Sequence, residues 1–155
     1  MTSSEKTALK TSLKQYCQSV IEQRIAASKA IINNAQEAAN NEEKSSAGDK
    51  YETARAMSHL EKDMHTRQLA EHLKDLAALN VIDATILHTE VTTGAYIDCT
   101  DISFFIAAGL GKQQVDGKTI WILSPQAPLL KQLLHKKTGD SFTFSNRQAI
   151  IADLF

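Results

Sequence analysis

Two acidic residues, Asp49 and Glu52, stand three positions apart in the stretch 45–55, which reads SSAGDKYETAR. Side chains at this spacing face the same way when the backbone is helical, and carboxylate oxygens are hard ligands of the kind that suit Mg²⁺. The same acids also suit a helix cap, because an acid at a helix start offsets unpaired N–H groups and the positive end of the helix dipole. Both roles are open at this point.

The acids lie between two long helical patterns. From Glu5 to about Glu43 the chain has no proline or glycine, and apolar residues recur at steps of three and four. The segment from Tyr51 to about Leu79 also lacks proline and glycine and repeats apolar residues at these steps, except for one step of five residues. The second stripe consists of Met57, Leu60, Met64, Leu69, Leu73 and Leu76. Narrow stripes joined by a short connection predict an antiparallel coiled-coil hairpin over residues 1–79, with its tip at about 44–52.

Residues 80–155 change character, because β-branched and aromatic residues now come in short runs. Turn signals, including Thr93-Gly94, Asp116-Gly117 and Gly139-Asp140, separate these runs. Strands are predicted at 84–87, 95–99, 103–107, 119–123, 141–144 and 149–154, with a loop at 109–112. Pro125 and Pro128 precede leucines at helical spacing, which predicts one helix. The fold class is therefore α+β, with a helical hairpin followed by a small sheet domain.

Composition limits the classes of function. The chain has 155 residues, 43% hydrophobic and 23% charged, with a formal net charge of −1. This charge gives no global attraction to nucleic acids or acidic membranes. No run of about 18 apolar residues occurs, so a cytoplasmic protein without a membrane partner is expected. Cys17 and Cys99 fit neither a disulfide framework nor a CxxC site, and both are expected to be reduced thiols.

One segment of the second half resembles a known family. The stretch from Ile122 to Phe144 is similar to the C-terminal domain of the bacterial Gre-type transcript cleavage factors, GreA and GreB. The matching positions are Ser124, Pro128, the leucines, Lys136 or Lys137, and Gly139-Asp140, while His135 stands where the family usually has glycine. The resemblance extends to the order of a helical hairpin and a sheet domain. It implies that the sheet domain is FKBP-like and antiparallel.

The tip resembles the family as well, since 48–54 reads GDKYETA against the family's Gly-Asp-x-x-Glu-Asn-Ala. The resemblance implies an accessory factor rather than an enzyme, whose hairpin enters the secondary channel of RNA polymerase. Asp49 and Glu52 would there share a Mg²⁺ ion with the polymerase and orient a water, so that the polymerase cleaves its own backtracked RNA. No tightly bound cofactor is implied, and the RNA 3′ end is reached only within the complex.

A second register of the tip stays open. The family's asparagine is Thr53 here, and its tyrosine position is Ala56. Aligning Tyr51 with that tyrosine moves the acidic positions to Lys44 and Ala47, which do not bind metal. This register predicts a regulator that occupies the polymerase channel without stimulating cleavage.

Other residues receive roles by the same resemblance. Lys44, Lys50 and Arg55 surround the tip and are candidates for contacts with RNA phosphates, although such residues are also typical of a solvated helix face. Ser124, Pro125 and Pro128 are candidates for docking on the polymerase. A coiled-coil chaperone or prolyl isomerase module is the alternative from a different class. The oligomeric state of the free protein is left open.

Overall fold

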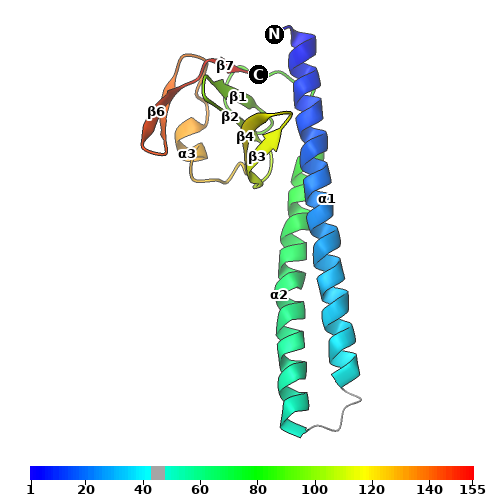
Figure 1. Cartoon of the computed structure of the whole chain (residues 1–155). Coiled ribbons are helices and arrows are strands. Elements are labelled where there is room, and N and C mark those ends of the chain that lie inside the picture. The colour runs from blue at the N-terminus through cyan, green and yellow to red at the C-terminus, as the bar shows by residue number, and fades with distance from the viewer. Residues whose placement is uncertain (43–47) are drawn as a thin grey trace. The chain divides into compact units, whose positions relative to one another are not determined.

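The chain folds into long helices followed by a small sheet, as seen in a computed structural model (Figure 1). The structure describes residues 1–42 and 48–155, with side chains described outside 42–51. The helices are α1 (Ser3–Glu42), α2 (Gly48–Asn80) and the short α3 (Leu130–Leu133). The α+β class and the two long helices predicted from sequence are confirmed. The coiled-coil geometry and the FKBP likeness stay predictions.

Internal contacts divide the chain into two compact units. One consists of residues 1–19 with 77–155, and the other of residues 20–76. The first turns of α1 therefore group with the sheet, whereas the sequence pattern placed the domain boundary at residue 80. Among the described residues, no helix combines the length and the apolar character needed to cross a membrane.

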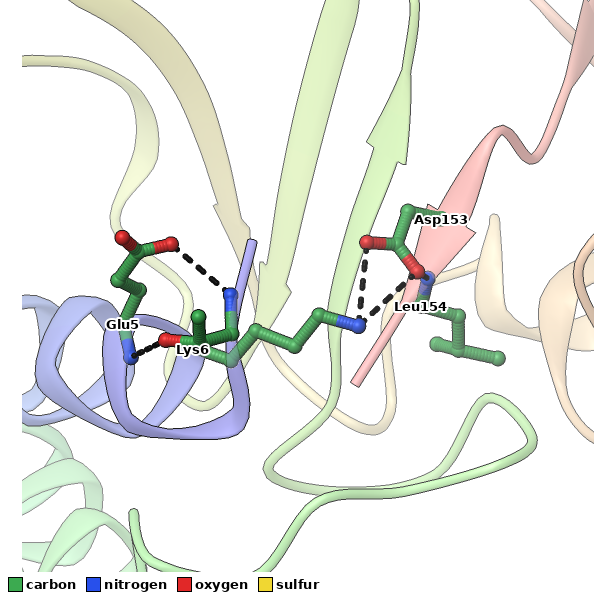
Figure 2. Close-up of polar contacts among 5 residues, drawn as sticks. Glu5, Lys6, Asp153 and Leu154 are labelled. Carbon is green, nitrogen blue, oxygen red and sulfur yellow. Dashed lines mark hydrogen bonds and ion pairs between the residues drawn. The ribbon is translucent and has the colours of Figure 1, made fainter.

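The start of α1 is held by reciprocal hydrogen bonds and by an ion pair (Figure 2). The Thr2 N–H donates to Glu5 Oε2 (2.9 Å), and the Glu5 N–H donates to Thr2 Oγ1 (3.1 Å), which is a capping box. Lys6 Nζ lies 3.4 Å from Asp153 Oδ2 and 5.0 Å from the centre of the Phe155 ring. The first helical turn is thus tied to the last strand of the sheet.

The sheet has five strands in the order β3-β4-β2-β1-β7, and β5 and β6 form a separate hairpin. The strands are β1 (Tyr96–Cys99), β2 (Ile102–Ile106), β3 (Gly111–Val115), β4 (Lys118–Leu123), β5 (Ser141–Phe144), β6 (Arg147–Ile150) and β7 (Asp153–Leu154). All pairs are antiparallel except β2 with β4, which is parallel. The expectation of a fully antiparallel sheet is corrected at this pair, because the chain returns to β2 through the β3–β4 hairpin.

Both faces of the central strands are buried. On one face, Phe104 and Ile106 of β2 join a core with Leu130 and Leu133 of the α3 helix. Alternation along β2 points Phe105 to the other face, where it is fully buried. The base of α1 reaches the sheet through Tyr16 Oη, which donates to Gln113 Oε1 (2.7 Å) on β3. Strands buried on both faces read as continuous apolar runs, as ISFFI does.

Three strand predictions are corrected. The segment 84–87 is a loop, because the Asp83 carboxylate accepts the Thr85 N–H (2.9 Å) in a local turn that competes with strand pairing. Residues 111–115 form an edge strand, although a loop was predicted at 109–112. Polar residues such as Gln113 do not show the apolar pattern typical of a strand. The predicted strand 149–154 is divided between β6 and β7, since the Ala152 N–H already donates to Asp98 O (2.8 Å) of the larger sheet.

The two cysteines are free and buried. Burial raises the pKa of the Cys17 thiol to about 12 and that of Cys99 to about 11. Both side chains therefore remain neutral thiols at physiological pH, and neither has the lowered pKa of a reactive cysteine.

Two lysines of α1 hold the segment after α2. Lys10 Nζ donates to Ile86 O (2.6 Å), and Lys14 Nζ donates to Ile82 O (2.6 Å). Lys10 is fully buried, and this burial lowers its pKa to about 8, an effect that Asp83 partly offsets. A buried ammonium group costs free energy when it is charged, so Lys10 makes the stability of this unit depend on pH.

We expect the free energy of unfolding of the wild type, relative to that of a Lys10→Met variant, to rise with pH between about 8 and about 10.5. In this window the unfolded chain keeps the lysine proton and the folded chain has lost it, so raising the pH favours folding. The rise is about 3 kcal/mol at most. Urea denaturation across this range measures it, and a constant difference between the two proteins would contradict the assignment. Comparing the two proteins cancels the titration of the buried thiols, which has the opposite sign.

The face of α2 that packs on α1 differs from the predicted stripe. Met57, Leu60, Met64 and Leu73 are 65%, 70%, 50% and 47% exposed. The half-buried positions include a run at alternating steps of four and three, which consists of Ser58, Lys62, His65, Leu69, His72 and Leu76. A skip of five turns a helical stripe by about 140°, so residues before and after it cannot face one partner. The face containing Leu69 and Leu76 is the one that α1 covers.

The seam between α1 and α2 is consequently rich in polar groups. Lys62 Nζ donates to Gln36 Oε1 (2.7 Å) across the two helices. Ser28 of α1 is buried. His65 Nδ1 is buried and finds no hydrogen-bond partner among the residues that the structure describes. A buried polar atom without a partner lowers stability, so this histidine weakens the hairpin.

We expect a His65→Leu variant to increase the free energy of unfolding of the hairpin by about 1–2 kcal/mol. The leucine removes the unpartnered nitrogen and adds apolar surface to the seam. Urea denaturation followed by the helical circular dichroism signal measures the change. Met64→Leu is the matched control, because the neighbouring side chain is half-exposed, and it should change stability by less than about 0.5 kcal/mol. Equal effects of the two substitutions would contradict the placement of His65 in the seam between α1 and α2.

Candidate functional site

The two tip acids lie at the start of α2. Asp49 and Glu52 are the second and fifth residues of this helix, which begins at Gly48. Helical geometry places residues three apart on one face, and the Glu52 side chain is exposed. The Asp49 side chain lies outside the described part of the structure. This placement agrees with the acid pair expected at a helix start and equally with a favourable interaction with the helix dipole.

The basic candidates of the tip are placed unevenly. Lys44, and Ala47 of the alternative register, lie outside the described residues. Lys50 belongs to α2, but its side chain is not among those described. Arg55 is exposed on α2, one turn after the acids, and already takes part in an interaction within the protein.

By residue type and spacing, Asp49 and Glu52 would supply part of a magnesium site. Carboxylates on successive turns of one helix offer oxygen ligands to a single ion, and Glu52 is open to solvent. Two carboxylates supply only part of the oxygen shell of Mg²⁺, so the remaining ligands must come from water or from a partner. Elsewhere in the described chain, no group of three or more His, Cys, Asp or Glu side chains is arranged to hold a metal ion.

The docking candidates form a tight turn after β4. The Gln126 N–H donates to Ser124 Oγ (3.1 Å), while this hydroxyl donates to Gln126 Oε1 (2.7 Å). The Ala127 N–H donates to Ser124 O (2.9 Å). Pro125 is half-buried in this turn, and Pro128 is exposed just before α3. The fixed φ of both prolines suits a rigid turn that leads into a helix.

An apolar hollow of about 330 Å³ lies beside this turn. It is lined by Pro125, Gln126, Ala127, Leu130, Lys131 and Leu134. Leu134, the first residue after α3, is 48% exposed. The leucine spacing predicted that Leu134 is part of the helix, whereas it follows the helix and is partly exposed. The signal was present, because Leu133 and Leu134 are adjacent and cannot both face the core from one helical turn.

The residue after this leucine, His135, has an unusual backbone conformation. His135 has φ = 67°, in the left-handed region where glycine is favoured. The family's usual glycine would meet this requirement without strain. Here the His135 imidazole Nδ1 lies 3.1 Å from Glu90 Oε1 instead. A residue with a side chain thus occupies a backbone conformation that glycine adopts more readily.

Comparisons with known proteins add little beyond this geometry. No family model matches the chain, and no curated protein matches it. Among solved structures, a chain described as the structure of the transcription factor Gfh1 aligns with 12% identity and a TM-score of 0.38. The alignment covers 89% of this chain and 92% of that chain. A TM-score this low does not establish a shared fold.

Proposed function

We propose that this protein is a cytoplasmic accessory factor that binds RNA polymerase, in the manner of the Gre-type factors that its sequence resembles. Its hairpin enters the secondary channel, and Asp49 with Glu52 assists cleavage of backtracked RNA by the polymerase. The observation that carries the proposal is the position of the Gly-Asp-x-x-Glu motif, which coincides with the first residues of α2 after the hairpin connection.

In this proposal the carboxylates of Asp49 and Glu52 are the groups of this chain that take part in the cleavage reaction. They accept hydrogen bonds from a water and hold it near the RNA phosphate, while the long helices bring them to the polymerase active site. A Mg²⁺ ion shared with the polymerase supplies positive charge that polarises water and phosphate oxygens. Lys50 and Arg55 add positive charge near the RNA backbone, and Lys44 does so if it faces the channel.

The proposed docking surface is the apolar hollow beside α3. We expect Leu134→Asp to weaken binding to bacterial core RNA polymerase by about tenfold or more, because it places a charge in an apolar contact. Binding of the labelled protein to the polymerase measures the effect. Val81→Asp is the matched control, because Val81 is 82% exposed and lies outside the hollow. Equal weakening by the two substitutions would contradict docking at this hollow.

The same experiments separate the competing functions. Binding to the polymerase together with faster RNA cleavage supports the proposal. Binding without any change in cleavage identifies a regulator that only occupies the channel, as the second register of the tip predicts. A protein that does not bind polymerase but accelerates prolyl isomerisation or suppresses aggregation is the chaperone or isomerase module.

A further inference from the structure

The two outer edges of the β5–β6 hairpin differ in whether their backbone groups make further hydrogen bonds. The β5 edge is closed by one side chain of α3, because the Thr143 N–H donates to Gln132 Oε1 (3.2 Å) and Gln132 Nε2 donates to Thr143 O (3.2 Å). An amide placed this way occupies the hydrogen bonds that another strand would make. No described residue outside the hairpin makes a hydrogen bond to the β6 edge, and Figure 1 shows β6 on the outer side of its unit.

The register of the hairpin identifies the open backbone groups. Phe144 pairs with Arg147 across a two-residue turn, in which Ser145 and Asn146 both have positive φ (50° and 61°). In such a hairpin the pair next to the turn exchanges hydrogen bonds, and alternate residues then point outward. The outward residues of β6 are Gln148 and Ile150. Within the described part of the chain, neither makes a backbone hydrogen bond outside this sheet.

A cavity of about 510 Å³ lies along this same edge. Phe144, Arg147 and Ala149 line it from the inner face of the hairpin, and Cys99, Asp101 and Ile102 line it from the β1–β2 turn. A strand added to β6 continues the pleat of the sheet. Its residue opposite Ala149 therefore points into the cavity, while its neighbours on either side bond to the backbone of Gln148 and Ile150.

The size of the cavity argues against a second copy of this chain as the added strand. Antiparallel pairing of β6 with itself satisfies Gln148 and Ile150 only when Ala149 lies opposite Ala149. Two methyl groups would leave most of the 510 Å³ unfilled, and unfilled apolar space is unfavourable. The cavity suits a large apolar side chain, which β6 does not offer at this position.

The charges at the cavity define the partner further. Arg147 is exposed, lies two residues from Ala149 on the same face, and has no ion pair among the described residues. Directly opposite charges stabilise cross-strand pairs. Asp101 lines the same cavity, so a second acid is not expected inside it.

We propose that the outer edge of β6 binds an extended segment of another polypeptide by strand addition. The segment pairs antiparallel with β6 and places one large apolar side chain in the cavity. An acidic side chain, two residues further toward the C-terminus of the segment, lies beside Arg147. Backbone hydrogen bonds to Gln148 and Ile150 provide the affinity, and the cavity with Arg147 provides the selectivity. This binding site is separate from the tip acids and from the hollow beside α3.

Fluorescence anisotropy with a labelled peptide, acetyl-TVTFTETT-amide, tests the proposal on the full-length protein. Paired antiparallel to β6 with its phenylalanine opposite Ala149, this peptide has its glutamate opposite Arg147. The peptide should bind saturably, and replacing its phenylalanine by alanine should weaken binding about tenfold. Methylating the backbone nitrogens of the two threonines beside the phenylalanine should weaken binding to a similar degree, because it removes the donors to β6. These peptide controls leave the folding of the protein untouched.

A charge exchange tests the register. Replacing the peptide glutamate by lysine should weaken binding to the wild type about fivefold, and the Arg147→Glu variant should restore it. Rescue of this kind does not arise from a misfolded variant. Equal binding of the methylated and unmethylated peptides would overturn strand addition. Absence of saturable binding, or a dimer of the free protein that the peptide does not dissociate, would overturn the proposal as well.

Discussion

Replacing Glu52 by glutamine should reduce stimulation of RNA cleavage by about 100-fold while polymerase binding is retained, and Asp49→Asn should do the same. The amide keeps the size of each side chain but removes the negative charge that holds a metal ion and orients water. Losing one group of preorganised charge at a reacting centre typically costs two to three powers of ten in rate, about 100–1000-fold. The assay is cleavage of labelled, backtracked RNA in stalled elongation complexes with Mg²⁺.

Glu61→Gln is the matched control for this experiment, because Glu61 is an exposed glutamate on the same helix, more than two turns away. It should leave cleavage unchanged. If the wild type stimulates cleavage and all three variants stimulate it equally well, Asp49 and Glu52 act only at the helix start and not in catalysis. In that case the amide substitutions should still lower the stability of α2 by about 0.3–1 kcal/mol, through the lost interaction with the dipole.

The largest expected effect on stability is that of Phe104→Ala, which should lower the free energy of unfolding by about 3–5 kcal/mol. Phe104 is fully buried in the centre of β2. Its ring meets Phe142 at 5.8 Å and Phe144 at 5.2 Å between centroids, both edge to face. The substitution removes these contacts and leaves a cavity between the sheet and the β5–β6 hairpin. Urea denaturation of the full chain measures the loss.

Ile150→Ala provides the comparison, since Ile150 is 60% exposed and should cost less than about 1 kcal/mol. Phe104→Leu keeps part of the volume and should fall between the two, which guards against a Phe104→Ala chain that does not fold. A loss for Phe104→Ala as small as that for Ile150→Ala would show that β2 is not the centre of the core.

Local sequence signals were sufficient for the elements with strong local causes. The long helices were predictable because two uninterrupted segments lack proline and glycine and keep a helical period. The turns at Asp116-Gly117 and Gly139-Asp140 were predictable because these residues tolerate positive φ, which Asp116, Gly117 and Gly139 adopt. The edge strand β3 was not predictable, because Gln113 is polar and its hydrogen bond to Tyr16 joins segments that are far apart in the sequence.

The candidate functional sites were also only partly predictable from the sequence. The Asp-x-x-Glu spacing and its position after the hairpin connection could be read from the sequence. For the hollow beside α3, the adjacent Leu133 and Leu134 indicated only that one leucine faces away from the core. The hollow itself depends on how the turn at Pro125 and the end of α3 fold against the core. The open edge of β6 was equally hidden, since it follows from Gln132 closing only the other edge.

The sequence by itself determined the α+β class, the two long helices and the positions of the tip acids, because each follows from residues that are close along the chain. Only the tertiary structure decided which face of α2 is buried. Its apolar residues before and after the five-residue skip point in different directions, and the partner helix can cover one direction only. Tertiary structure also decided the parallel pairing of β2 with β4 and the burial of Lys10, since both depend on contacts between distant segments.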